Sequence, residues 1–406
     1  MARRNGGFVG QDGLDAPDPP TGITPTVGGS SVSVAFTAPT DAGTSAITGF
    51  VVQVSTDDTD YSAGSNTGTS SPIVVSSLTN GTAATAKVWA INAYGTSAPS
   101  AASASFTPAL DRILHMGGRR FNVDYEGSTV NTIEFITPST TGNPTDFGDL
   151  LAARYDARTG AAGSSTRTLY IGGGSSNVIQ YINPASAGNA TDFGDAQSSY
   201  GLNAGSTSNS TRAVFGEGTA TLSYVTIASA GNASTFGALT EAAEIGAALA
   251  SSTRGVFHIG RGENTSGGTI LEYITIGSTG NSTDFGDPTQ GRRSTATGGS
   301  GTRGILSGGD NGSGTKYNVI DYITIASTGN ASDFGDLAAA INNHAGAGGT
   351  TRSVFFGGSI ATSDPNNVNT IQYITTASTG NATDFGDVST PSSVATAGSA
   401  NHGGLQ

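Results

Sequence analysis

The chain contains no cysteine among its 406 residues, which excludes disulfide bridges and zinc sites built from thiolates. Charged residues are scarce, at 12%, and no apolar stretch is long enough to cross a membrane as a helix. The formal net charge is −13. This excess of acid argues against nucleic acid and against membrane insertion or an anionic membrane as partner.

The sequence also lacks a recognisable set of catalytic residues. It shows no Ser/His/Asp arrangement, no carboxylate dyad and no glycine-rich phosphate loop. The tripeptide Asp-Phe-Gly occurs repeatedly but has no His-Arg-Asp companion, so it does not indicate a kinase. The four histidines show no metal-ligand spacing: His115, His258, His344 and His402. We therefore expect no enzyme, no catalytic residue, no cofactor and no metal.

What the chain does have is a repeat. The phrase Tyr-Ile-Thr-Ile-Ala-Ser-Thr-Gly-Asn-Ala-Ser-Asp-Phe-Gly-Asp, at residues 322–336, recurs in degraded form six times after residue 110. A period of about 40 to 50 residues built from short β-like runs is typical of propeller blades. The recurring phenylalanines are Phe147, Phe193, Phe236, Phe285, Phe334 and Phe385. An arginine followed by an apolar run and glycine precedes each of them, at Arg112, Arg167, Arg212, Arg254, Arg303 and Arg352.

Each repeat predicts four strands. The arginine-led run gives the first strand. The Tyr-Ile-Thr-Ile run gives the second, with Ile320 and Tyr322 on one face and Ile323 and Ile325 on the other. Apolar residues on both faces indicate a sheet pressed between two neighbours. The third strand surrounds Asp-Phe-Gly-Asp, and a small-residue stretch such as 345–349 forms the innermost strand, where only small side chains fit.

The ends of the repeat region predict how it closes. The first repeat begins at Arg112 without a small-residue strand before it, and residues 392–400 resemble that missing strand. We expect residues 392–400 to pair with 112–118, so that the C-terminal strand completes the first sheet and hides its edges.

Three further motifs have a structural and a functional interpretation. We expect the six arginines to pair with acids of a neighbouring sheet, because Arg suits carboxylate pairing. The acidic pairs Asp284/Asp287 and Asp333/Asp336 are better explained as turn caps than as calcium ligands. The Asn-x-Ser/Thr sequences are better explained as turns than as glycosylated sites; they begin at Asn189, Asn232, Asn281, Asn330 and Asn381.

Residues 16–108 predict a separate β-sandwich, because short alternating runs such as Val32, Val34 and Phe36 are separated by turn clusters. The unit resembles a fibronectin type III domain in Pro19-Pro20-Thr-Gly, Ile47-Thr-Gly-Phe50 and Val88-Trp-Ala-Ile-Asn92-Ala-Tyr-Gly95. Phe36 stands where that family usually has Trp. Ala84 stands where it usually has a corner Tyr, so we expect a looser corner.

Trp89 is the only tryptophan and falls at an outward position of its strand. A lone aromatic residue more often covers a strand surface than anchors a partner, and both interpretations stay open.

The repeats of residues 109–406 resemble the kelch family of propellers in the strand ending in Gly-Gly, the following aromatic strand and a later large aromatic. The resemblance implies an all-β fold with a six-bladed kelch-like propeller after the sandwich. The repeats and the start Met-Ala-Arg-Arg-Asn-Gly-Gly also resemble virion proteins of marine tailed phages, including cyanophages.

That second resemblance implies a non-enzymatic virion structural protein in multiple copies, such as a tail or neck fibre or a capsid decoration. Its partners would be other virion proteins and a host surface glycan or protein, and it would be assembled in the host cytoplasm. We expect residues 1–15 to be an extended docking arm, with Arg3, Arg4, Phe8 and Val9 contacting another virion protein. The start has no apolar core of a secretory signal. The alternative is a bacterial cell-surface adhesin or glycan-binding propeller, and a glycosidase is a more distant one.

Overall fold

The computed structural model describes residues 14–399, apart from 29, 80–81, 109–110, 122–126, 155–161, 174, 201–204, 217, 242, 263–267 and 361–366. Every regular element in these residues is a strand, so the protein is all-β. None of the described segments is a helix with the length and apolar character of a membrane span. The chain divides into two compact units, Met1–Leu110 and Asp111–Gln406.

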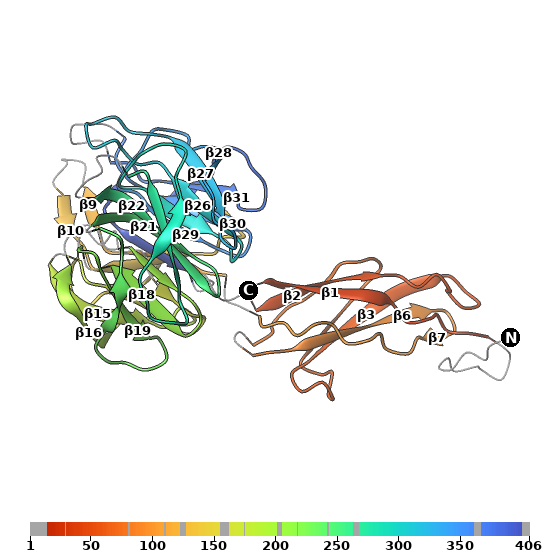
Figure 1. The fold of residues 1–406 in the computed structure, drawn as a ribbon. Coiled ribbons are helices and arrows are strands. Elements are labelled where there is room, and N and C mark those ends of the chain that lie inside the picture. Colours follow the sequence, from red (N-terminus) through yellow and green to blue (C-terminus); the bar gives the residue numbers. More distant parts are fainter. Residues whose placement is uncertain are drawn as a thin grey trace. The chain divides into compact units, whose positions relative to one another are not determined.

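The first unit is built from two antiparallel sheets (Figure 1). Its core comes from one face of each sheet, because strands such as Ser31–Thr37 bury every second residue. Val32 and Val34 are fully buried, and the Phe36 ring lies 4.8 Å from the Phe50 ring at a tilt of 55°. One sheet has the order β1 (Thr21–Gly28), β2 (Ser31–Thr37), β5 (Ile73–Val75); the other has β4 (Gly64–Gly68), β3 (Ile47–Ser55), β6 (Thr85–Asn92), β7 (Gly95–Thr96).

After β7 the chain runs beside β6 and hydrogen-bonds to it at every third residue, whereas a regular strand would do so at every second residue. The backbone nitrogens of Ser97, Ser100 and Ser103 donate to carbonyls of β6 at 2.8–3.0 Å. Their hydroxyls accept from backbone nitrogens of β6 at 3.0 Å each. Three β6 nitrogens thus donate to serine hydroxyls instead of to backbone carbonyls. The segment ends where Ala84 and Phe106 exchange two backbone hydrogen bonds of 2.8 Å.

Asn92 fixes the point at which the N-terminal segment joins the sandwich. Its amide nitrogen donates to the carbonyls of Asp15 and Ala42, and its amide oxygen accepts from the nitrogens of Tyr94 and Gly95. All four hydrogen-bonding positions of this buried side chain are used.

The described residues of the second unit form six four-stranded antiparallel sheets, numbered here 1 to 6 along the chain. Each has the order inner strand, first strand, second strand, outer strand. Sheet 1 is β34 (Thr396–Ser399), β8 (Ile113–Met116), β11 (Thr132–Ile136), β12 (Thr145–Asp149); sheet 2 is β13 (Ala162–Gly163), β14 (Thr168–Ile171), β15 (Ser176–Ile182), β16 (Thr191–Tyr200); sheet 3 is β17 (Ser206–Ser208), β18 (Arg212–Gly216), β19 (Thr221–Thr226), β20 (Ser234–Ala238). Sheet 4 is β21 (Ala243–Ala250), β22 (Arg254–Gly262), β23 (Ile270–Thr275), β24 (Thr283–Gly286); sheet 5 is β25 (Ala296–Gly299), β26 (Arg303–Ser307), β27 (Val319–Thr324), β28 (Ser332–Asp336); sheet 6 is β29 (Ala345–Gly348), β30 (Arg352–Phe356), β31 (Thr370–Thr375), β32 (Thr383–Asp387). A small sheet joins β10 (Gly127–Thr129), β9 (Arg119–Phe121) and β33 (Ser392–Ser393).

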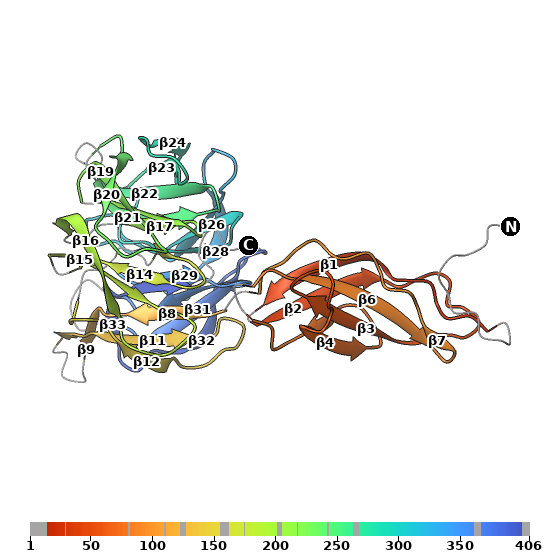
Figure 2. The same ribbon diagram turned by 90° about the horizontal axis from the view of Figure 1, so that it is seen from below.

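Sheet 1 is completed by the C-terminal strand, as the sequence predicts. β34 pairs antiparallel with β8, with Thr396 opposite Met116 and Ser399 opposite Ile113. Figure 2 shows β8 and β11 of sheet 1 beside β31 and β32 of sheet 6. The two ends of the repeat region therefore meet in one sheet.

Each sheet packs its two faces into two different apolar clusters, which confirms the two-faced pattern of the second strand. Ile320 joins the cluster that contains Phe334 and Phe355, whereas Ile323 and Ile325 join the cluster of sheets 4 and 5. Six clusters separate successive sheets, and one of them lies between sheets 6 and 1. The inner strands also contact one another in cyclic order: β13, β17, β21, β25, β29, β34 and again β13. We call each boundary between successive sheets a seam.

Candidate functional site

At each seam, an arginine joins two sheets. In sheet 4, the guanidinium carbon of Arg254 lies 4.3 Å from the centre of the Tyr273 ring, and its Nη1 donates to the carbonyl of Ile325 in sheet 5 at 2.9 Å. A cation over an aromatic face is favourable, and the same group supplies a charged donor. The corresponding donor–acceptor pairs are Arg112–Pro184, Arg167–Ile227, Arg212–Ile276, Arg303–Thr376 and Arg352–Pro138.

The expected pairing of these arginines with acids is therefore wrong. Within the described residues, none of the six forms an ion pair. Each arginine begins a first strand or, as Arg112 and Arg167 do, directly precedes one. The turn of the next sheet presents a carbonyl at this point. The aspartates lie on the outer strands instead, where Asp333 is exposed and Asp336 is half-buried.

The phenylalanine of Asp-Phe-Gly is an extra residue in its strand. In sheet 5 the register shifts so that Asp333 is opposite Asp321 and Gly335 is opposite Ile320, and Phe334 has no partner. This bulge turns the Phe334 ring into the seam, where it meets the edge of Tyr322 at 6.0 Å and 78°. The same register shift occurs in the other five sheets.

The glycine after that phenylalanine permits the next sheet to approach. A Cβ atom on Gly237 would lie 2.0 Å from the carbonyl oxygen of Gly280 in the next turn. The backbone nitrogen of Gly280 donates to the carbonyl of Phe236 at 2.9 Å. Beside it, the side-chain oxygen of Asn281 accepts from the nitrogen of Ala238 at 3.1 Å.

These contacts recur at all six seams, and we call them together the clasp: the arginine-to-carbonyl bond, the glycine-to-phenylalanine bond and the asparagine bridge. At the seam of sheets 6 and 1, they are Arg352–Pro138, Gly142–Phe385 and Asn143–Asp387. The repeated phrases Ser-Thr-Gly-Asn and Asp-Phe-Gly-Asp are thus the two halves of one clasp. The asparagines of the Asn-x-Ser/Thr sequences serve in it as acceptors.

A second set of seam contacts is buried and differs from seam to seam. Each second strand carries one buried polar residue among its apolar neighbours: Glu134, Gln180, Ser223, Glu272, Asp321 and Gln372. Each contacts the preceding sheet or the loop after it. The partners, in the same order, are Ser389, Leu151, Gln197, Thr240, Thr289 and Ala338.

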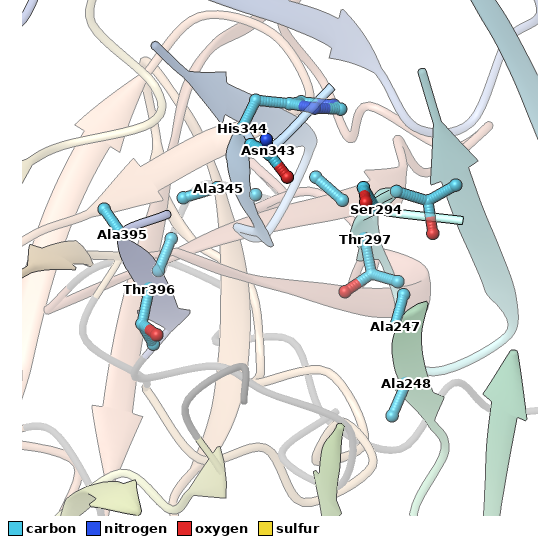
Figure 3. A pocket seen from close by; sticks show the side chains of 13 residues that line it. Ala247, Ala248, Ser294, Thr297, Asn343, His344, Ala345, Ala395 and Thr396 are labelled. Atoms are coloured by element: carbon cyan, nitrogen blue, oxygen red, sulfur yellow. The ribbon is translucent and has the colours of Figure 1, made fainter. Parts of the chain in front are cut away.

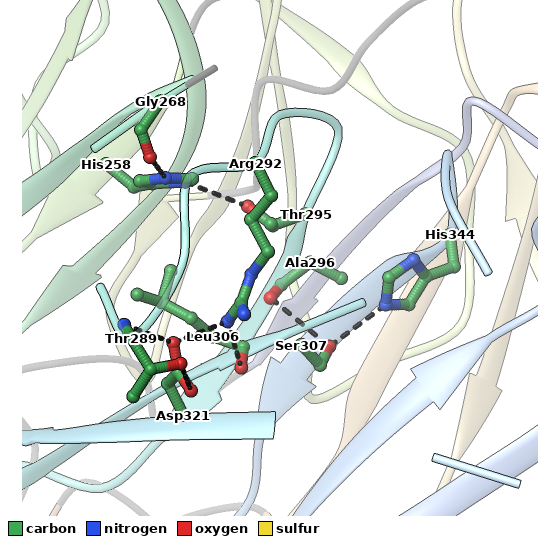
Figure 4. A network of polar contacts seen from close by, with 10 residues as sticks. All are labelled: His258, Gly268, Thr289, Arg292, Thr295, Ala296, Leu306, Ser307, Asp321 and His344. Atoms are coloured by element: carbon green, nitrogen blue, oxygen red, sulfur yellow. Dashed lines mark hydrogen bonds and ion pairs between the residues drawn. The ribbon is translucent and has the colours of Figure 1, made fainter. Parts of the chain in front are cut away.

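The largest of these buried contacts joins Arg292 and Asp321 (Figure 4). Both side chains are 0% exposed, and Arg292 Nη2 lies 2.8 Å from Asp321 Oδ2. The carboxylate also accepts from the nitrogen and the hydroxyl of Thr289. Burial of a charge is costly unless it is paired and hydrogen-bonded, and Asp321 meets both conditions.

Two buried histidines surround this pair. Thr295 contacts His258 Nδ1 at 3.1 Å and the Gly268 carbonyl contacts its Nε2 at 3.1 Å, while His344 Nε2 lies 2.9 Å from the Ser307 hydroxyl (Figure 4). Burial, with the charge of Arg292, lowers the pKa of His258 to about 4 and that of His344 to about 3. Both rings are therefore neutral at pH 7.

A second buried pair joins Arg120 of the small sheet to Glu134 of sheet 1, at 2.7 Å. Burial opposes ionisation of Glu134, but the contact with His115, the charge of Arg120 and the bond from Ser389 outweigh it and lower its pKa to about 2. Burial also lowers the pKa of His115. These carboxylates are held in ion pairs and hydrogen bonds inside the fold.

The inner strands leave a small cavity near their start (Figure 3). It has a volume of about 30 Å³ and is lined by four segments from sheets 4, 5, 6 and 1, mostly alanine and threonine. Ser294, Asn343 and Val394 precede three of these strands in the left-handed region, with φ of 56°, 57° and 49°. A cavity of this size holds about one or two water molecules, so it is no site for an organic substrate.

The structure places the predicted residues as follows. Arg3, Arg4, Phe8, Val9 and His402 lie outside the described residues. The buried histidines His115, His258 and His344 do not converge on a metal, and the described residues contain no group of three or more His, Asp or Glu that could hold one.

The sequence analysis did not predict the two buried ion pairs, Arg120–Glu134 and Arg292–Asp321. A signal was present, because Asp321 interrupts an otherwise apolar strand whose two faces both pack against neighbours.

The outward face of β6 carries Trp89, which is half-buried. Its ring meets Tyr61 edge-on at 6.4 Å and 76°, and the Lys87 ammonium lies 4.4 Å from the centre of the Tyr61 ring. Trp89 does not belong to the apolar core of the sandwich.

Comparison with known proteins identifies the first unit. The fibronectin type III domain family matches residues 18–106. Residues 18–106 form a fibronectin type III domain. The structure of titin domains A168–A170 is similar over 23% of this chain and 32% of that chain, at 28% identity and a TM-score of 0.22. The matched part is thus about a third of the titin chain. No curated protein matches the chain.

Proposed function

We propose that the chain is a non-enzymatic structural protein of a tailed-phage virion, a tail or neck fibre or a capsid decoration. In this proposal residues 1–15 dock on another virion protein, the fibronectin type III domain is a spacer, and residues 109–406 are a six-bladed kelch-like propeller displayed for contact with a host surface or another protein. The resemblance of the repeats to marine phage virion proteins is the observation that carries it.

The cyclic order of the seams supports the propeller. Six apolar clusters, six clasps and the pairing of β34 with β8 are what a ring of six blades requires. The seam contacts support a display role, because each seam combines apolar packing with backbone hydrogen bonds and a stacked arginine.

The contacts of the buried carboxylates support a role other than catalysis. Glu134 and Asp321 are ion-paired, and Glu272 accepts from Thr240 and Ser282. A glycosidase needs two carboxyl groups facing a substrate cleft.

The arrangement of Asp15 supports an arm that leaves the sandwich at one fixed point. Asn92 and Thr44 hold Asp15 through its carbonyl and nitrogen. A glycine-rich segment beyond such a point can order on binding a partner.

Localisation tests the proposal. Particles purified from cells that carry the gene should contain the protein by mass spectrometry, and immunogold labelling should place it on an appendage or on the capsid. Removal of residues 2–10 should reduce its copy number in particles, with both folded units intact by circular dichroism. Absence from particles together with presence in the cell envelope would contradict the proposal and favour the adhesin.

A further inference from the structure

The geometry points to a saccharide-binding site on the outward face of the fibronectin type III domain, for a neutral linear oligosaccharide. Six side chains of this face are called the outer platform: Trp89, Val51, Thr67, Lys87, Gln53 and Ser65. The inference goes beyond the proposed function, in which this domain is only a spacer, and it is measured on the isolated protein.

The strand register sets the layout of the outer platform. Val51 of β3 is opposite Trp89 of β6 and Thr67 of β4, which gives one row across three strands. Gln53 is opposite Lys87 and Ser65, which gives a second row. Directly opposite residues share a face of a sheet. The apolar surface of Trp89 and Val51 is therefore bordered by an amide, an ammonium and two hydroxyls.

The loop before β4 is shaped to hold an aromatic ring beside this face. The Asp57 carboxylate accepts from the Ser55 hydroxyl at 2.9 Å and from the nitrogens of Thr59 and Asp60 at 2.9 and 2.8 Å. Asp58 has a φ of 62° and accepts from the Thr85 hydroxyl, which also contacts the Tyr61 hydroxyl. Tyr61 is thereby fixed against Trp89 before any ligand arrives, which reduces the entropic cost of binding.

Trp89 and Tyr61 lie outside the apolar core of the domain. The core on the other face of the sheet is complete with residues such as Phe36, Phe50 and Val88. Within the described residues, no hydrogen bond uses the side chains of Gln53, Ser65 or Thr67, and the two hydroxyl residues are exposed. Donors and acceptors therefore stand free around a preformed aromatic surface, which is the composition of a ligand site.

The charges around the platform select the class of ligand. Lys87 already occupies the face of Tyr61 and would repel a cation. Asp57, Asp58 and Asp60 lie in the adjoining loop and would repel an anion. A pyranose ring is neutral, offers an apolar C–H face to an aromatic ring, and presents hydroxyls to the polar border. We therefore assign the site to a neutral hexose chain.

The single tryptophan of the chain supplies a direct measurement. The full-length protein is titrated with maltoheptaose, cellohexaose or laminarihexaose while its tryptophan emission is followed. We expect a saturable blue shift with at least one of them, and calorimetry should show the same affinity. A flat emission and no heat with all three sugars up to about 10 mM, the range of weak binding, would overturn the assignment.

Variants separate the platform from the rest of the molecule. Trp89→Ala should abolish binding and Tyr61→Ala should weaken it at least tenfold, both measured by calorimetry and both without loss of cooperative unfolding. Tyr94→Ala is the control, because Tyr94 is 50% exposed on the same domain but outside the platform; it should bind as the wild type does. Unchanged binding by Trp89→Ala would place the sugar elsewhere and contradict the site. Failure of sugar binding would leave the virion assignment untouched, because that is tested by localisation.

Discussion

The backbone nitrogen of Gly142 donates a hydrogen bond of 2.8 Å to the carbonyl oxygen of Phe385. One residue belongs to the first sheet of the repeat region and the other to the last. The same bond occurs at each of the other five seams. The junction between the two ends of the repeat region is therefore built from the same contacts as the seams inside it.

Close approach at the clasp predicts a large cost for one added methyl group. Gly237→Ala places a Cβ about 2.0 Å from the Gly280 carbonyl and should lower the free energy of unfolding by at least about 2 kcal/mol, since the backbone must shift. Gly277→Ala is the matched control, because a Cβ there meets nothing within 4 Å and should change stability by less than about 0.5 kcal/mol. Urea unfolding measures both. Equal effects would refute the clasp as a close contact.

Loss of the buried arginine should be costly, because it leaves a buried acid unpaired. Arg292→Met should lower the free energy of unfolding by about 3 to 5 kcal/mol, and adding Asp321→Asn should restore most of it. Arg293→Met is the neighbouring control. The side chain of Arg293 is 29% exposed, and its partner Asp310, which is 7% exposed, keeps hydrogen bonds from Asn342 and Gly312. Its loss should therefore cost less than the loss of Arg292, about 1 to 2 kcal/mol. A double variant no more stable than Arg292→Met alone would contradict this account.

The buried histidines predict a loss of stability in mild acid. In the unfolded chain they bind protons near pH 6.5, but in the folded chain only near about 4 for His258 and about 3 for His344. Between these values the unfolded state binds more protons, so stability falls as the pH falls below 6.5. The fall should approach about 1.4 kcal/mol per pH unit for each histidine.

Urea unfolding at pH 7, 6 and 5 measures this slope above the range where most carboxylates titrate. The double variant His258→Asn/His344→Gln should be less stable at pH 7 but should show a flatter pH profile. A profile as steep as that of the wild type would assign the acid sensitivity to other groups.

Removal of the C-terminal strand should open the repeat region. Deletion of residues 390–406 removes β33 and β34, so that β8 keeps β11 on one side and loses its partner on the other. An unpaired strand edge promotes association with other chains, so we expect aggregation by light scattering and loss of cooperative unfolding. Deletion of residues 401–406 keeps β34 and is the control. A monomeric, cooperatively folding 1–389 protein would contradict closure by β34.

The sequence predicted features that depend on one strand and its immediate neighbours. Alternation in Val32, Val34 and Phe36 gives a half-buried strand, and the apolar pairs around Tyr322 give a strand buried on both faces. The match between residues 392–400 and the other inner strands was sufficient to predict their pairing with β8. Each of these inferences uses only periodicity and repetition.

Periodicity and repetition could not predict which residues contact each other across a seam. The partner of Arg254 is a carbonyl in another sheet, and a carbonyl carries no signal in a sequence. Charge complementarity suggested the aspartates, but the bulge at Phe334 places them on the exposed outer strand. Arg292 lies in a loop, and only its approach to Asp321 makes it a buried ion.

The buried polar contacts differ from seam to seam, and this difference affects which changes in the number of repeats the fold can accept. Repeats this similar in sequence invite recombination, which would delete or duplicate a whole copy in frame. The clasp would accept such a product, since its parts are the same at every seam. The buried pairs would not accept it. Loss of sheet 5 would place Gln372 of sheet 6, in place of Asp321, beside sheet 4 and Arg292. Arg292 would then be a buried cation without an acid, at a cost of about 3 to 5 kcal/mol. The clasp contacts would therefore permit any number and order of repeats, whereas a few buried polar side chains favour the present number and order.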